Sequence, residues 1–156
     1  MCFVCGLENS FGLKSKFYEL ENGQLMAVFS PLQEHQGYPG RLHGGIAATI
    51  LDETIGRAIM ATDSEDLWGV TIDFSMKFRK PIPLDEEVRV FGWVTAEKPR
   101  YFTAEGKILL SDGTVAATAE GKYLKMAVDN ITESGGADAV GWQVYSDRED
   151  PEYIDI

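Results

Sequence analysis

Residues 41–56 read RLHGGIAATILDETIG, and this stretch decides the fold. From His43 onward apolar residues recur at spacings of three and four, which is typical of one face of a helix. Frequent alanine supports the same prediction, and the pattern fades near Thr62. No other part of the chain keeps this spacing over a comparable length. The sequence therefore predicts a single long helix that begins at His43.

On both sides of this helix the chain alternates between apolar and polar residues, as half-buried strands do. Strands are predicted over residues 12–20, 24–30, 70–79, 87–97, 100–111 and 114–126. Asn22-Gly23 and Ser111-Asp112-Gly113 mark hairpin turns, whereas the Pro- and Gly-rich residues 31–41 predict a loop. In residues 70–79 a strict alternation puts Val70 and Phe78 on an apolar face, and Thr71 and Lys77 on a polar face. One helix with one antiparallel sheet predicts an α+β fold.

The 156 residues fit one domain, expected over residues 1–128, followed by an acidic C-terminal extension over residues 129–156. The extension has eight acidic residues and one basic residue, so it carries most of the net charge of −11. It either docks through aromatic residues such as Trp142 or extends into solvent. This acidity does not suit a nucleic-acid binder. No apolar run is long enough to span a membrane and no secretion signal is evident, so we expect a cytoplasmic protein.

Cys2 and Cys5 form a Cys-x-x-Cys pair that could serve as a redox pair or as half of a zinc site. Zinc normally takes four ligands, and the chain has no second cysteine pair. Only His35 and His43 could complete such a site, at unusual spacing. We therefore expect two reduced, structurally neutral thiols and no metal.

The residues that carry chemistry lie at the start and the middle of the predicted helix. Gly44 and Gly45 leave backbone amides uncovered at a helix N-terminus, which is the chemistry of an oxyanion hole. Asp52 has apolar neighbours and is thus either a functional carboxylate or a solvent-facing residue beside Glu53. His43 is either a base or an anchor of the loop through hydrogen bonding.

The His-Gly-Gly block, with its aspartate within the same helix, resembles the hotdog-fold acyl-CoA thioesterases. The resemblance is to the phenylacetate-pathway (PaaI-like) branch and its mammalian relatives, and it covers roughly residues 2–126. It is also carried by residues 2–6, 36–40 and 69–83. It implies a hotdog fold, in which the antiparallel sheet wraps around one long central helix. It further implies hydrolysis of acyl-CoA thioesters to free acid and CoA, without a cofactor, by a homodimer or homotetramer.

The resemblance also implies roles for individual residues. Asp52 would act as general base or as nucleophile, and Thr71 would orient the water or the carboxylate. The site would be completed at a dimer interface, which allows Thr71 to face the Asp52 of a partner chain. The amides of Gly44 and Gly45 would polarise the thioester carbonyl. The residues matching coenzyme A contacts are Lys77, Arg79, Arg100 and Tyr101. Some relatives carry Asn or Gln six residues before the histidine, where this chain has Gly37 beside Gln36.

Two other functions fit the same residues. A hotdog hydratase or dehydratase acting on enoyl-CoA thioesters would pair His43 with Asp52. A non-catalytic acyl-CoA-binding module would keep Lys77 and Arg79 without hydrolysing anything. The Gly-x-Ser-x-Gly motif of α/β-hydrolases does not occur in the chain, which disfavours that route to hydrolysis.

Overall fold

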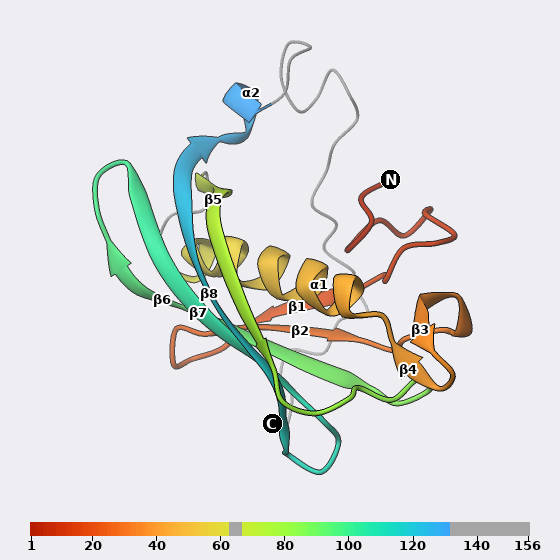
Figure 1. The fold of residues 1–156 in the computed structure, drawn as a ribbon. Helices are drawn as coiled ribbons and strands as arrows, with labels where there is room; N and C mark the ends of the chain where they lie inside the picture. The colour runs from red at the N-terminus through yellow and green to blue at the C-terminus, as the bar shows by residue number, and fades with distance from the viewer. Residues whose placement is uncertain (63–66, 132–156) are drawn as a thin grey trace.

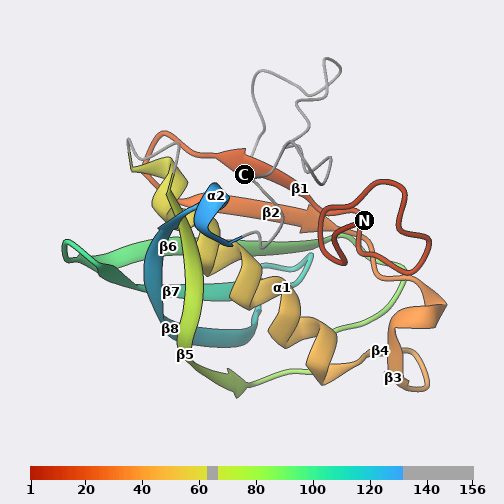
Figure 2. The same ribbon diagram turned by 90° about the horizontal axis from the view of Figure 1, so that it is seen from above.

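A computed structural model describes residues 1–62 and 67–131 of the chain. Its central element is helix α1 (Gly44–Arg57), which continues into the 3-10 turn η2 (Ala58–Ala61). A six-stranded antiparallel sheet has the order β1-β2-β6-β7-β8-β5 and curves around this helix (Figures 1 and 2). The strands are β1 (Lys16–Glu19), β2 (Leu25–Phe29), β5 (Leu67–Phe78), β6 (Val88–Glu97), β7 (Tyr101–Leu109) and β8 (Val115–Ala127).

The core lies between α1 and the concave face of the sheet. Ile50, Leu51 and Ile55 of α1 are fully buried, and each such side chain contributes about 1.5–3 kcal/mol through burial. The helix sits directly on β6, where a Cβ added to Gly92 would lie 2.9 Å from the carbonyl oxygen of Thr54. The close approach of α1 to β6 therefore requires glycine at this position of the strand. The sheet side of the core includes Val88, Val90, Phe102, Ala104, Ile108 and Ala117.

The structure confirms the predicted helix, both hairpins and the α+β class. Gly23 and Gly113 have φ angles of 76° and 81°, which is why glycine stands in these two turns. The expected loop over residues 31–41 is wrong in part, since it contains the 3-10 turn η1 (Gln33–His35) and two short paired strands, β3 (Gln36–Tyr38) and β4 (Arg41–Leu42).

A buried histidine explains this ordered connection. The Leu32 N–H donates to Nδ1 of His35, and Nε2 of His35 lies 3.1 Å from the carbonyl oxygen of Phe11. After β8, a short helix α2 (Val128–Ile131) crosses the expected domain boundary at residue 128. Most of the predicted acidic extension lies outside the described residues. Within residues 1–62 and 67–131, no helix is long and apolar enough to cross a membrane.

The predicted alternation along β5 is wrong at one point, because a bulge interrupts the strand. Thr71 pairs with Tyr123 of β8, but the next paired residue is Asp73, opposite Lys122. Ile72 is the extra residue, and 55% of its surface is exposed. The bulge turns Thr71 toward α1, whereas the sequence placed it on the polar face with Lys77. Bulges re-aim side chains in this way and are frequent beside active sites.

Candidate active site

The carboxylate of Asp52 is held by two hydroxyl groups from neighbouring strands. Asp52 is half-buried on α1. Its Oδ1 accepts hydrogen bonds from Thr71 Oγ1 and from the Tyr123 hydroxyl, both at 3.0 Å, and Oδ2 lies 3.2 Å from Thr71 Oγ1. Thr71 and Tyr123 are paired residues of β5 and β8, so the sheet register fixes both donors together. The structure thus brings Thr71 to the Asp52 of its own chain.

Tyr123 is the residue that the sequence reasoning missed. Its side chain is fully buried and stacks on Phe102, with ring centroids 5.2 Å apart. Burial, followed by the negative charge of Asp52, raises the pKa of Tyr123 far above its usual value, so the phenol stays protonated and remains a donor. A buried tyrosine on the apolar face of a strand usually needs a hydrogen-bond partner, and that was the available signal.

The two glycine amides at the start of α1 differ in their hydrogen bonding. His43 caps the helix, and its Nδ1 accepts the N–H of Gly45 at 2.9 Å. Of the two roles that the sequence left open for His43, this hydrogen bond fits the anchor of the loop. The Gly45 amide already donates to His43 and is not available to another acceptor. The N–H of Gly44 meets no acceptor among the described residues and lies on the exposed surface. The expected pair of amide donors is thus reduced to Gly44.

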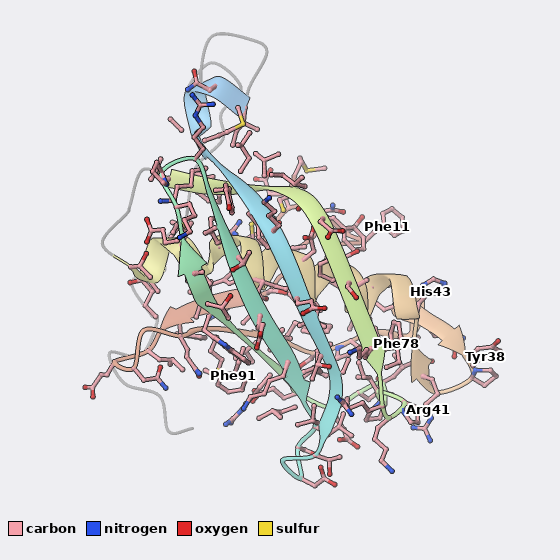
Figure 3. The ribbon with its side chains drawn as sticks, turned by 60° about the vertical axis from the view of Figure 1, so that its left-hand side comes forward. Phe11, Tyr38, Arg41, His43, Phe78 and Phe91 are labelled. Atoms are coloured by element: carbon pink, nitrogen blue, oxygen red, sulfur yellow. The ribbon has the colours of Figure 1, made fainter. Side chains whose placement is uncertain are left out.

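Phe78 lies beside this helix start, as Figure 3 shows for Phe78 and His43. A Cβ added to Gly44 would be 3.4 Å from Cζ of Phe78, which is ordinary contact. Gly44 and Asp52 are eight residues apart in one helix, so about 12 Å of helix axis separates them. The free amide and the carboxylate of a single chain are therefore too far apart to act on one carbonyl group.

The expected coenzyme A contacts fall into two separate groups. Lys77 points outward from β5 opposite Thr118, and Arg79 follows the end of that strand. Tyr101 starts β7 opposite Leu124 and lies under Lys122, whose Nζ is 4.1 Å from the ring centroid. Leu124 and Thr118 are six residues apart on β8, which corresponds to about 20 Å. One chain therefore does not gather Lys77 and Arg79 with Arg100 and Tyr101.

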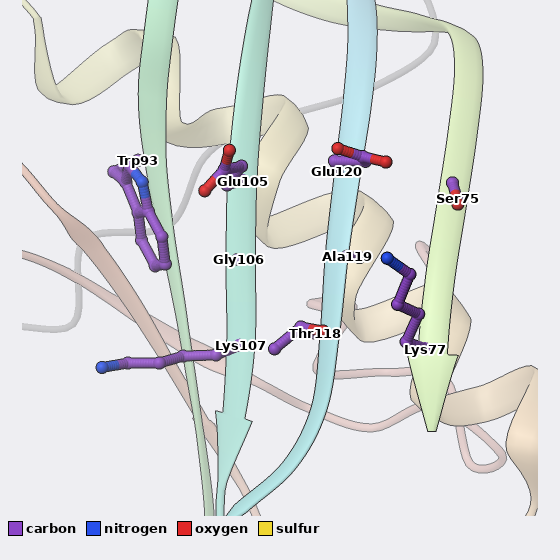
Figure 4. A pocket seen from close by; sticks show the side chains of 9 residues that line it. All are labelled: Ser75, Lys77, Trp93, Glu105, Gly106, Lys107, Thr118, Ala119 and Glu120. Atoms are coloured by element: carbon purple, nitrogen blue, oxygen red, sulfur yellow. The ribbon is translucent and has the colours of Figure 1, made fainter. Parts of the chain in front are cut away.

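A shallow hollow of about 270 Å³ lies on the outer face of the sheet, away from α1 (Figure 4). Trp93, Lys107 and Lys77 line it together with the carboxylates of Glu105 and Glu120, which are direct cross-strand neighbours. Neither Asp52 nor Thr71 reaches it, because both lie on the other side of the sheet. Asp52 lies outside this hollow and, in contrast to it, is held by hydrogen bonds from two hydroxyl groups.

Several known proteins are similar to this chain in sequence. The family model described as the thioesterase superfamily matches residues 39–117. Acyl-coenzyme A thioesterase THEM4 of Rattus norvegicus is 35% identical over 83 residues, which cover 53% of this chain and 34% of that protein. Acyl-coenzyme A thioesterase 13 of Homo sapiens is 27% identical over 104 residues, which cover 66% of this chain and 72% of that protein. The chain thus matches only about a third of the length of the rat protein.

Solved structures show the same fold. A crystal structure of a thioesterase superfamily protein superposes with a TM-score of 0.71 at 29% identity, covering 77% of this chain and 61% of that one. A Streptococcus mutans protein solved with acetyl-CoA bound gives a TM-score of 0.65 at 17% identity, covering 78% of this chain and 92% of that one. The second likeness supports the fold alone. Together with the single helix inside the sheet, these matches confirm the predicted hotdog fold.

Proposed function

The chain belongs to the thioesterase superfamily, and on this premise we propose that it hydrolyses acyl-CoA thioesters to a free acid and CoA. The observation that carries the proposal is the Asp52 carboxylate, which two hydroxyl donors hold beside the β5 edge. Support also comes from the two relatives described as acyl-coenzyme A thioesterases. A thioester carbonyl is electrophilic enough for one carboxylate and one amide donor to suffice.

Asp52 has two possible roles in this reaction. As a general base it takes a proton from water while the water oxygen attacks the thioester carbon. As a nucleophile its own oxygen attacks, and water then cleaves the resulting anhydride. Both routes break the carbon–sulfur bond, and the sulfur leaves as a thiolate that gains a proton. Thr71 and Tyr123 favour either route, since both donate hydrogen bonds to the carboxylate and so hold it in one orientation.

The distance between Gly44 and Asp52 favours a site shared by two copies of the chain. β5 is an edge strand, and its neighbour in the described sheet is β8 alone. Ile72 and Phe78 expose 55% and 60% of their surface along this strand. A twelve-residue edge strand that exposes two large apolar side chains is a natural place for a second strand to pair.

Antiparallel pairing of two β5 strands about an axis near Phe74 would place Thr71 of one copy beside Phe78 of the other. Phe78 adjoins Gly44, and Thr71 contacts Asp52. The carboxylate of one copy would thereby approach the free amide of the second copy. The same pairing would bring Lys77 and Arg79 of one copy toward the strand end of the other that carries Arg100 and Tyr101. We therefore propose a homodimer as the smallest active unit, alone or within a homotetramer.

Mixing two inactive variants tests this sharing. Asp52→Asn removes the carboxylate, and Gly44→Pro removes the amide hydrogen. If each site takes Asp52 from one chain and Gly44 from the other, half of the sites in a mixed dimer are intact. Refolding an equimolar mixture should then restore about a quarter of the wild-type activity, because random pairing gives half mixed dimers. Activity no greater than that of the separate variants would contradict a shared site.

The function itself is tested by the products formed from a panel of short, long and aryl acyl-CoAs. We expect release of free thiol, measured with a thiol reagent, together with the free acid in equal amount. An enoyl-CoA hydrated without thiol release would favour the hydratase alternative, and binding without any product would favour the binding module. The hydrogen bond from Gly45 to His43 weighs against the hydratase, since it occupies Nδ1 and leaves only Nε2 of this histidine for proton transfer.

A further inference from the structure

The N-terminal cysteine pair meets the middle of α1 in a cluster that the proposed hydrolysis does not use. Three possible ligand atoms lie within 4.8 Å of one another, namely the Sγ atoms of Cys2 and Cys5 and a carboxylate oxygen of Glu53. All three residues are half-buried, and both cysteines are free thiols. The sequence offered only histidines as partners for the cysteines, but His35 is engaged with Leu32 and Phe11. The third donor is a glutamate 48 positions after Cys5.

From this cluster we infer that Cys2, Cys5 and Glu53 bind one zinc-type divalent ion, with water completing a tetrahedron. Thiolates and carboxylates are both ligands of Zn²⁺, whereas Mg²⁺ and Ca²⁺ take oxygen ligands. The spacing of two residues between the cysteines is common in zinc sites. Three protein ligands and one water complete four-coordination, so the site requires no fourth protein ligand.

The turn that carries the cysteines is held in a fixed shape. The Val4 N–H donates to the Cys2 sulfur at 3.3 Å, and the Gly6 N–H donates to the Cys2 carbonyl oxygen at 3.1 Å. A Cβ at Gly6 would lie 2.4 Å from that oxygen, so this tight turn requires glycine. The turn is tied down further, because Leu13 N–H donates to the Phe3 carbonyl oxygen at 2.8 Å. Both sulfurs are therefore presented together before any ion arrives.

Arg57 places a positive charge beside the three possible metal ligands and leaves one oxygen of Glu53 without a hydrogen bond from it. Its Nε donates to Oε1 of Glu53 at 2.6 Å, and a terminal nitrogen lies 3.1 Å from the Cys5 sulfur. The guanidinium is itself fixed over the ring of Phe17, 4.5 Å from the centroid. Oε2 of Glu53 accepts no hydrogen bond within the described residues, so one carboxylate oxygen stays open to an ion. Outer contacts of this kind orient ligands around bound metals.

Charge balance also favours a divalent ion at this place. Two thiols, one carboxylate and one guanidinium are neutral together. Binding of a divalent ion releases two protons, and two thiolates, one carboxylate, one guanidinium and the ion are again neutral. A half-buried site avoids the cost of an unpaired charge in both states. The ion would join the N-terminal segment to α1 one residue away from Asp52.

The test uses the full chain with a native N-terminus, purified with a phosphine reductant and without chelator. We expect about one zinc per chain by elemental mass spectrometry. X-ray absorption should show two sulfur and two oxygen or nitrogen neighbours, at about 2.3 and 2.0 Å. Cobalt(II) should give the thiolate charge-transfer band and the strong visible bands of a four-coordinate ion.

Variants decide which residues are ligands. Cys2→Ser and Cys5→Ser should each weaken the thiolate charge-transfer band of bound cobalt, since one thiolate remains, and should lower the affinity for the ion by at least about a hundredfold. Glu53→Gln should weaken binding by at least about tenfold. Glu8→Gln, which removes an exposed carboxylate of the same segment, should leave binding unchanged. Circular dichroism of each variant shows whether the fold is kept.

Three results would overturn the inference. The first is the absence of metal both after purification and after titration with zinc. The second is metal binding that survives the cysteine substitutions, which would place the ion elsewhere. The third is a Cys2–Cys5 disulfide in the wild type, together with no uptake of zinc after that disulfide has been reduced.

Discussion

The hydroxyl of Tyr123 donates to Oδ1 of Asp52 at 3.0 Å, across 71 positions of the sequence. The contact joins β8 to the middle of α1 and points a buried phenol at the proposed catalytic carboxylate. Room for the ring comes from Gly121, where a Cβ would lie 2.6 Å from the tyrosine ring. We therefore expect Tyr123 to be a positioning residue, which acts on the proposed reaction through Asp52.

Replacement of Tyr123 by Phe should slow catalysis without weakening substrate binding. The ring and its stacking on Phe102 are kept, but Asp52 loses one of its two hydroxyl donors. A hydrogen bond to a charged group is worth about 1.5–3 kcal/mol, so we expect kcat to fall by roughly tenfold or more, with KM nearly unchanged. Steady-state thiol release measures both constants. A rise in KM at constant kcat would contradict the positioning role.

The raised pKa of Tyr123 should make stability depend on pH in alkaline solution. In the unfolded chain the phenol ionises near its ordinary pKa of about 10, but burial and Asp52 raise the pKa in the folded state. The folded chain therefore holds this proton more tightly, and its advantage is fully present below pH ~10 and declines as pH rises above it. Urea unfolding at pH 9 and pH 11 should show a larger loss for the wild type than for Tyr123→Phe. Tyr38→Phe, at an exposed tyrosine, should lose as much as the wild type.

Two substitutions of Thr71 separate the effect of its hydroxyl group from the effect of its shape. Thr71→Val keeps the branched side chain in the bulge but removes the donor to both Asp52 oxygens. We expect kcat to fall by about tenfold or more, because a bond to a charged group is lost. Thr71→Ser keeps the hydroxyl and should retain most of the activity. Loss of activity in Thr71→Ser but not in Thr71→Val would show that the methyl group, rather than the hydroxyl, is what matters.

The Gly44 amide can be removed with little change to the helix. Proline is well tolerated as the first helical residue, and His43 before it already has the extended conformation that proline requires, with φ −64° and ψ 133°. Gly44→Pro should therefore fold normally but lose about a hundredfold or more in kcat, as expected for removal of an oxyanion donor. Gly44→Ala keeps the N–H, and its Cβ would only touch Phe78. If the proline variant matches the alanine variant in kcat, Gly44 is not the donor.

Local signals predicted most of the fold. The three-and-four spacing after His43 gave α1, and glycine at positions 23 and 113 gave both hairpin turns, since each pattern acts over a few residues. The side of the sheet that Thr71 faces was not predictable from alternation, because a bulge adds a residue at Ile72. A bulge depends on how β5 and β8 pair, which no local pattern records.

Only the part of the site that lies on α1 could be predicted from the sequence. Asp52 stood out because a carboxylate among apolar helix neighbours needs a reason. Tyr123 and the contact of Glu53 with the cysteine pair escaped prediction, because both arise where distant segments pack against α1. The roughly 12 Å between Gly44 and Asp52 follows from helix rise alone, and the proposal of a site shared by two copies rests on this distance.

The most direct test of the account is free-thiol release from acyl-CoA by the wild type and by Asp52→Asn, at matched concentration and with matched circular dichroism. Asparagine keeps the size of the side chain and can still bond to Thr71, but it is neither a base nor a carboxylate nucleophile. We predict that kcat/KM falls by at least about a hundredfold, equivalent to about 2.7 kcal/mol of transition-state stabilisation. Thiol release by Asp52→Asn within a few fold of the wild type would show that another group performs the hydrolysis.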